Sequence, residues 1–81
     1  MLQKGQGFAT DHLHWRLFVE VTDAGWTAYI QDLNKAKSIW RRNVASPDVG
    51  KEEALSMLSA LSGIPISELQ GLEWLPCQAD R

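Results

Sequence analysis

Two runs of alternating apolar and polar residues, joined by a short glycine turn, constrain the fold of this chain more than any other feature. Apolar residues occupy every second position in 15–22, and the pattern returns in 26–31. A period of two is typical of a β-strand with one buried face. Asp23, Ala24 and Gly25 separate the runs, and Gly25 can adopt a positive φ without steric cost. The sequence therefore predicts an antiparallel hairpin.

Two registers of this hairpin are compatible with the sequence. Matching the apolar faces, with Trp15 and Trp26 as core residues, requires an even number of loop residues. A glycine in the third loop position instead favours a three-residue loop with a bulge. Because a slip of one residue exchanges the two faces of a strand, the two registers predict different cores, and the sequence leaves both open.

A third strand is predicted over 36–45, after a turn at 32–35. Neither of its faces is cleanly apolar. One face carries Ser38, Trp40, Arg42 and Val44, and the other carries Lys37, Ile39, Arg41 and Asn43. Mixed faces are typical of an edge strand, where charged side chains also discourage pairing with other chains.

An amphipathic helix is predicted over 51–62, because its apolar residues recur with a period of 3.6 and gather on one side. Gly63, followed by a proline two residues later, is a typical helix stop. Ser67 and Gln70 then have the spacing of a capping box, which predicts a short second helix near 67–72.

These elements predict a single α+β domain, in which a three-stranded antiparallel sheet (β-β-β-α) packs on one helix, with a short C-terminal helix. We expect the domain to span 12–76, between a flexible lead-in at 1–11 and a frayed C-terminus at 77–81. The chain has 81 residues, and a domain of this size hides only about 60% of its surface on folding. A partner subunit can therefore add stability, for instance in a homodimer formed through an exposed strand edge.

Composition excludes several classes of protein. The hydrophobic fraction of 44% and the charged fraction of 22% are those of a globular chain. The one cysteine, Cys77, cannot form an internal disulfide, which suits a reducing compartment. No apolar run approaches the roughly 20 residues that span a bilayer, and 1–15 lacks the apolar stretch of a signal peptide. We therefore expect a cytoplasmic protein that does not contact membranes.

The sequence offers little for catalysis or metal binding. His12 and His14 are spaced to share a metal, but tetrahedral zinc needs three or four ligands and the other soft ligand, Cys77, is far along the chain. Glu52 and Glu53 are adjacent carboxylates that the start of a helix explains. No nucleophile elbow, zinc-protease helix or phosphate-binding glycine loop occurs. We predict a protein that is not an enzyme and uses no metal or cofactor.

The formal net charge of −2 conceals a segregation of charge along the chain. Residues 35–51 carry five basic groups and one acidic group, for a charge of +4, whereas residues 52–81 carry one basic and five acidic groups, for −4. Trp40 stands among the basic groups, and an aromatic side chain flanked by arginines can anchor a protein interface or stack on a base. The predicted binding residues are Lys35, Lys37, Trp40, Arg41 and Arg42.

Three short motifs follow one another in the order hairpin, turn and helix. They are Gly25-Trp26-Thr27-Ala28-Tyr29, Gln31-Asp32-Leu33 and Glu52-Glu53-Ala54-Leu55. With this order, the segment 18–61 resembles the sheet-and-helix module of HicB-type antitoxins. The family's Pro-Gly-Cys is replaced by Asn34-Lys35-Ala36, and the loop before the helix is longer. The resemblance implies a partner protein that is neutralised by binding, such as a ribonuclease toxin, and no catalysis.

We therefore expect a small non-catalytic regulator that binds another protein. It would act by occluding an enzyme or toxin, in the manner of antitoxins or of small inhibitors such as those of phages. The alternative is a nucleic-acid-binding module in which Trp40 stacks on a base and the basic groups of the third strand contact phosphates. The salt dependence of binding distinguishes the two hypotheses. Affinity for a nucleic acid should fall by close to one log unit per log unit of salt concentration for each phosphate that is contacted.

Overall fold

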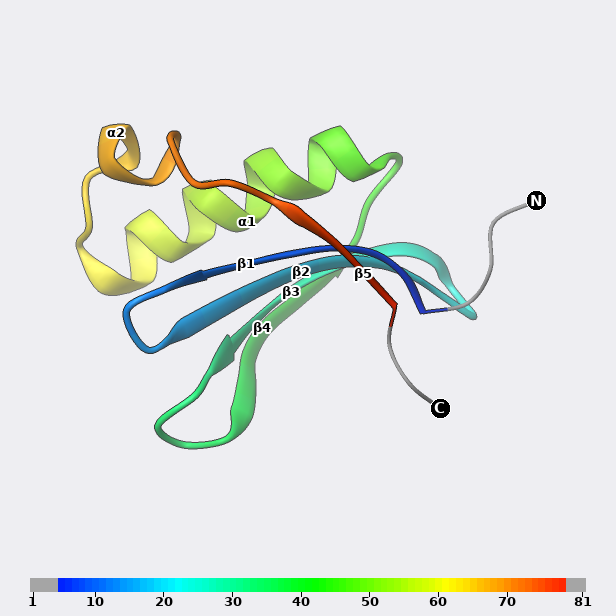
Figure 1. The fold of residues 1–81 in the computed structure, drawn as a ribbon, viewed down its shortest axis with the longest axis horizontal. Helices are drawn as coiled ribbons and strands as arrows, with labels where there is room; N and C mark the ends of the chain where they lie inside the picture. Colours follow the sequence, from blue (N-terminus) through cyan, green and yellow to red (C-terminus); the bar gives the residue numbers. More distant parts are fainter. Residues whose placement is uncertain (1–4, 79–81) are drawn as a thin grey trace.

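The computed structural model describes residues 5–78, which form an antiparallel five-stranded sheet with a long helix across one face (Figure 1). The strands are β1 (Gln6–His12), β2 (Trp15–Thr22), β3 (Gly25–Asp32), β4 (Lys37–Asn43) and β5 (Leu75–Gln78), and the helices are α1 (Pro47–Ser62) and α2 (Ile66–Leu69). In the sheet the strands follow the order β4-β3-β2-β1-β5. The chain therefore meanders through β1 to β4 and returns after the helices to add β5 beside β1.

The chain is an α+β domain, but the predicted three-stranded sheet is wrong because β1 and β5 also belong to it. Residues 6–11, which we expected to be a flexible lead-in, form most of β1, and Cys77, expected in a frayed C-terminus, lies in β5. β1 lacks a clear alternating pattern of its own and forms a hairpin with the well-patterned β2, whereas β5 pairs with β1, which is distant in sequence. The outer parts of those two predictions, 1–4 and 79–81, lie outside the described residues.

The predicted hairpin is confirmed, and its register is the one that matches the apolar faces of β2 and β3. Thr22 pairs with Gly25, so that two residues form the loop, and Leu17 lies opposite Ile30. Gly25 has a φ of 97°, a conformation that glycine adopts without a steric penalty. The apolar residues of both strands therefore share one side of the sheet.

β4 is an edge strand, as predicted, but a bulge changes the assignment of its faces. Trp40 lies opposite Ile30, and the register then shifts so that Ile39 is an extra residue in the ladder. Ile39 and Trp40 consequently both pack against the core. Ser38 lies on the other side of the sheet, where it lines a hollow with Arg41. The prediction that Ser38 shares a face with Trp40 is therefore wrong.

α1 begins at Pro47, earlier than predicted, because Ser46 caps it. The Ser46 Oγ accepts the N–H of Val49 at 3.3 Å, and proline suits the first helical position. The helix stops at Gly63, as predicted, where a φ of 79° lets the Gly63 N–H donate to the Ser59 carbonyl at 2.9 Å. Both ends of the long helix are thus determined by local sequence.

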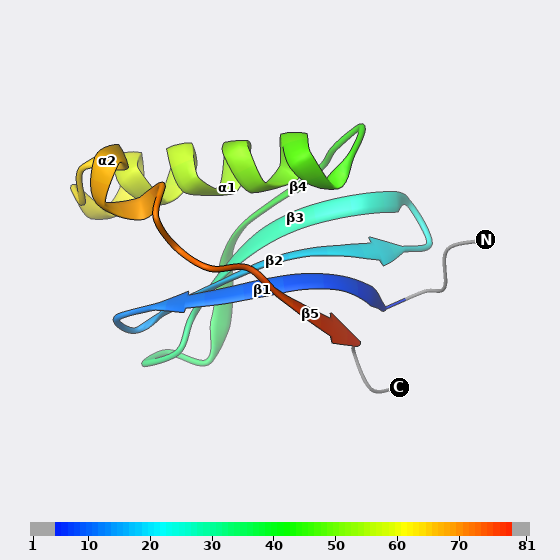
Figure 2. The same ribbon diagram turned by 45° about the horizontal axis from the view of Figure 1, so that its top comes forward.

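The core lies between the sheet and the two helices, which are on the same side of it (Figure 2). We call that side of the sheet the covered face; its fully buried residues are Leu17, Val19, Ala28 and Ile30. Ala54 and Leu58 of α1 and Leu69 of α2 are also fully buried. α1 approaches the sheet closely at Gly50, where a Cβ would lie 2.9 Å from a methyl group of Val19.

The second helix forms without the predicted capping box. α2 is a single turn preceded by Pro65, no side chain caps it, and Ser67 is an exposed residue within the turn. Burial of Leu69 and a 2.9 Å contact from His12 Nε2 to Glu68 Oε2 attach α2 to the core and to β1. Neither helix in residues 5–78 has the length and apolar character needed to cross a membrane.

Candidate binding surfaces

The β3–β4 turn presents two of the predicted binding residues to solvent. The Asp32 Oδ1 accepts the backbone N–H groups of Asn34 (3.0 Å) and Lys35 (3.3 Å), which fixes the conformation of the turn. Ala36 follows with a φ of 54°. Lys35 and Lys37 are exposed and form a cationic tip at one end of β4.

The other three predicted binding residues lie on two faces of β4. Trp40 is half-buried and packs against the core, so it is not an exposed anchor. Arg42 lies on the same side, and its Nη1 donates to the Oε1 of Glu53 at 2.7 Å, which ties β4 to α1. Arg41 is exposed on the opposite face, beside Tyr29. The structure therefore does not bring Lys35, Lys37, Trp40, Arg41 and Arg42 together on one surface.

A row of side chains crosses the sheet on the side away from α1, which we call the open face. The register places Arg41 opposite Tyr29, Tyr29 opposite Phe18, Phe18 opposite Ala9, and Ala9 opposite Leu75. We call these residues the open-face row. The rings of Phe18 and Tyr29 stack, with 4.7 Å between centroids and 19° between planes. Leu75 is 57% exposed. The row joins a cation, an aromatic pair and an exposed aliphatic side chain.

A buried carboxylate holds the aromatic pair in place. Glu20 is only 3% exposed, although it lies on the open face of β2. The Tyr29 hydroxyl donates to the Glu20 Oε1 at 2.5 Å. This hydrogen bond fixes the orientation of the Tyr29 ring, on which Phe18 stacks. The rings are therefore pre-organised, and binding costs them little conformational entropy.

A hollow of about 560 Å³ opens beside the row, over Ala9 and between Phe18 and Leu75. Arg16 and Asp11 border it and form a bidentate pair, with nitrogen–oxygen distances of 2.6 and 2.9 Å. The hydrogen bond from Arg16 lowers the pKa of Asp11, and the same bond raises the pKa of Arg16. The pair stays ionised at neutral pH, so the hollow has an apolar wall and a charged border.

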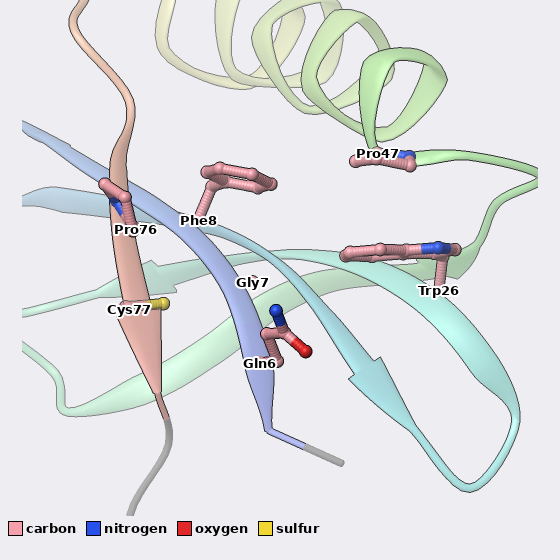
Figure 3. A pocket seen from close by; sticks show the side chains of 7 residues that line it. All are labelled: Gln6, Gly7, Phe8, Trp26, Pro47, Pro76 and Cys77. Atoms are coloured by element: carbon pink, nitrogen blue, oxygen red, sulfur yellow. The ribbon is translucent and has the colours of Figure 1, made fainter. Parts of the chain in front are cut away.

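A second hollow, of about 650 Å³, lies on the covered side of the sheet where the start of α1 faces β1 and β5 (Figure 3). We call it the α1 cleft. Its walls include the rings of Phe8 and Trp26 and the prolines Pro47 and Pro76. The ammonium of Lys51 lies 4.1 Å from the centroid of the Phe8 ring, within the range of a cation–π contact. The cleft is thus apolar, and the ammonium of Lys51 lies against Phe8, one of the residues that line it.

The titratable side chains give no sign of covalent chemistry or metal binding. In residues 5–78, no three His, Cys, Asp or Glu side chains gather as a metal ion requires. Cys77 is partly buried in β5, and burial, followed by the charge of Glu20, raises the pKa of its thiol. A thiol that is protonated at neutral pH is a poor nucleophile.

The alternating pattern alone does not identify Phe18 and Tyr29, because it assigns both to the polar face of the hairpin. The sequence nevertheless contains a signal for this surface. Two aromatic residues at positions that the pattern assigns to the polar face predict an apolar patch on the exposed side of the sheet. The pattern also predicts Trp26 as a core residue, whereas it is half-buried and lines the α1 cleft. Phe8 and Pro76 fall in segments for which the sequence predicts no strand.

Comparisons of the chain with protein-family models, with curated proteins and with solved structures found no match. The similarity of 18–61 to HicB-type antitoxins therefore stays a prediction. The functional argument rests on the geometry of the open face and of the α1 cleft.

Proposed function

We propose that this chain is a small non-catalytic protein-binding module that docks on its partner through the open face of the sheet. The observation that carries the proposal is the open-face row, where a stacked aromatic pair lies between the exposed Arg41 and the exposed Leu75. Tyrosine and arginine are among the residues that most often dominate binding energy at protein interfaces. An aromatic surface fixed by Glu20 suits that role.

The row specifies the chemistry of the partner. Phe18 and Leu75 call for an apolar patch on the partner, at the centre and at the β5 end of the contact. Arg41 lies at the β4 end, and Lys35 and Lys37 lie beyond it on the cationic tip. Charge complementarity therefore calls for carboxylates on the partner opposite β4. The proposed partner is a protein with an apolar patch bordered on one side by acidic residues.

The edges of the sheet favour contact through the face over the addition of a partner strand. β4 carries Lys37, Arg41 and Arg42 together with a bulge, all features that discourage edge pairing. β5 has four residues, and Pro76 has no N–H to donate to a further strand. A homodimer formed through a strand edge is for the same reason less favoured than face-to-face contact with another protein.

In its narrower form, the proposal is that the partner is a cytoplasmic enzyme or toxin and that binding occludes it. The resemblance of 18–61 to HicB-type antitoxins supports this form. The nucleic-acid alternative has less support, because Trp40 packs against the core and Arg42 is engaged by Glu53.

The proposal is tested by capture of partners from an extract of the source cells, with the tagged chain and two matched pairs of variants. Phe18→Ser and Arg41→Ser change the open face. Each has a matched control. Leu61→Ser, at an exposed apolar residue of α1, is the control for Phe18→Ser, and Arg42→Ser, at the neighbour of Arg41 on the covered side, is the control for Arg41→Ser. We expect a near-stoichiometric protein that both open-face variants lose and both control variants retain.

Nuclease treatment of the extract provides the second arm of the experiment. A protein partner of the open face should stay bound after the treatment. Capture of nucleic acid that carries all bound proteins with it would contradict the proposal, and so would a protein that Phe18→Ser and Arg41→Ser retain. Circular dichroism of each variant checks that loss of capture does not reflect unfolding.

A further inference from the structure

We propose that the α1 cleft binds a small apolar carboxylate. The inference is independent of the proposed function, because the cleft lies on the covered side of the sheet and shares no residue with the open-face row. It rests on the size of the cleft, on the composition of its walls and on the position of Lys51.

The size and walls of the cleft suit the body of a small apolar molecule. Its volume of about 650 Å³ lies within the range of roughly 300–1,000 Å³ that is usual for ligand pockets. Figure 3 shows Phe8 and Pro76 on one side and Trp26 beside Pro47 on the other. These side chains give an apolar ligand hydrophobic walls on two sides, and burying that ligand removes its surface from water.

Lys51 supplies the charge that selects an anion. Its Nζ lies 4.1 Å from the centroid of the Phe8 ring and 5.8 Å from that of Trp74. No carboxylate of residues 5–78 forms an ion pair with it, and Asp48, one turn earlier in α1, is exposed to solvent. A lysine has a long flexible stem and a compact ammonium. Lys51 does not itself line the cleft, but its ammonium lies against Phe8, which does, and rotation of the flexible stem can bring the charge to a carboxylate at the border of the cleft.

The occupant we infer is a free small molecule rather than the end of a peptide. A peptide lying along this side of the sheet would pair with the outer edge of β5. That edge is four residues long and contains Pro76, which cannot donate a hydrogen bond. The backbone therefore offers a peptide few partners, whereas an apolar carboxylate needs only the rings and the ammonium.

Decanoate and decanol form a matched pair of probes, since they share a chain length and differ in charge. Titration of the full chain labelled with ¹⁵N should give saturable shifts with decanoate, centred on the Trp26 indole N–H and on Phe8. We expect decanol to bind about three- to tenfold more weakly, the factor that one partly exposed charge contact contributes.

Variants of Lys51 test the role of its charge. Lys51→Met keeps a long apolar stem and removes the charge, so it should reduce decanoate affinity to that of decanol, while Lys51→Arg should retain the preference. Lys37→Met removes an exposed lysine far from the cleft and should change neither affinity. Equal affinity of the wild-type chain for the two probes, shifts that do not saturate, or shifts centred on Phe18 and Tyr29 would each overturn the proposal.

Discussion

The two faces of the sheet are built from the same strands but from different kinds of residue. On β2, Leu17 points to the covered face and is fully buried opposite Ile30, whereas its neighbour Phe18 is half-buried on the open face and stacks on Tyr29. The fully buried centre of the covered face is aliphatic, and the partly buried rings of Phe8, Trp26 and Trp40 lie around it. The open face carries aromatic and charged groups that the core does not need. The comparison separates residues that specify the fold from residues available for recognition.

The comparison also explains why a thin domain retains an aromatic pair outside its core. A chain of 81 residues has few buried side chains, and large rings would be the most effective means of enlarging that core. Phe18 and Tyr29 instead face away from α1 and are fixed by the hydrogen bond from Tyr29 to Glu20. A fixed apolar surface away from the core is what a docking face requires.

The largest expected effect comes from the covered face. Leu58 is fully buried, whereas Leu61 on the same helix is 52% exposed. Leu58→Ala should lower the free energy of unfolding by about 2–5 kcal/mol, because it leaves a cavity in the core. Leu61→Ala should lower it by less than about 0.5 kcal/mol. Urea denaturation followed by tryptophan fluorescence measures both, and equal losses would contradict the division into covered and exposed sides.

A second effect concerns the close approach of β1 to β2, which brings Ala9 into the open-face row. A Cβ on Gly7 would lie 2.1 Å from the Val19 carbonyl oxygen, whereas nothing lies within 4 Å of a Cβ on Gly71. Gly7→Ala should therefore destabilise the chain by about 2 kcal/mol, because a strand has to move. Gly71→Ala serves as the control and should be close to neutral in the same denaturation experiment.

A smaller loss of stability is expected on the open face. Phe18→Ala removes the stacking on Tyr29, which contributes roughly 0.5–1.5 kcal/mol, and also the burial of a half-buried ring, so it should cost about 1–2 kcal/mol in all. Thermal or urea denaturation should therefore rank Phe18→Ala well below Leu58→Ala. A loss as large as that of Leu58→Ala would make Phe18 a residue of the core and would remove the contrast between the faces.

The smallest effect is a change in reactivity rather than in stability. Because burial raises the pKa of the Cys77 thiol, its thiolate fraction at pH 8 is lower than that of a free thiol. Alkylation by iodoacetamide should be slower in the folded chain than in the chain unfolded by urea, and the rate should rise at higher pH. The folded chain favours the protonated thiol. The contribution of Cys77 to stability is therefore fully present below the pKa of the unfolded thiol and is lost as the pH rises through the higher pKa of the folded thiol. Equal rates would show that Cys77 is not protected.

Much of the fold could be predicted because its determinants are local. The hairpin follows from a period of two and from Gly25, and the end of α1 follows from Gly63. β1 and β5 could not be predicted, because 6–12 lacks clear alternation and β5 contains Pro76. β5 pairs with β1, which only the folded chain brings beside it, whereas β1 forms a hairpin with the next strand, β2.

The candidate site was predicted less well than the fold. Trp40, Arg41 and Arg42 are adjacent in sequence and were expected to act together, but alternation along β4 places Arg41 on one side and the other two on the opposite side. The open-face row cannot be recognised from sequence spacing. Its members are assembled by the register of four strand pairs, including pairs to strands that the sequence does not predict.

The central claim is that partners dock on the open face, and site-specific photo-crosslinking tests it most directly. A photoreactive phenylalanine analogue replaces either Leu75, on the open face, or Leu61, on the outer side of α1, two leucines of similar exposure (57% and 52%). After irradiation with the captured partner, we predict a crosslinked complex from position 75 and none from position 61. Crosslinking from position 61 alone would contradict the account and place the contact on the helix.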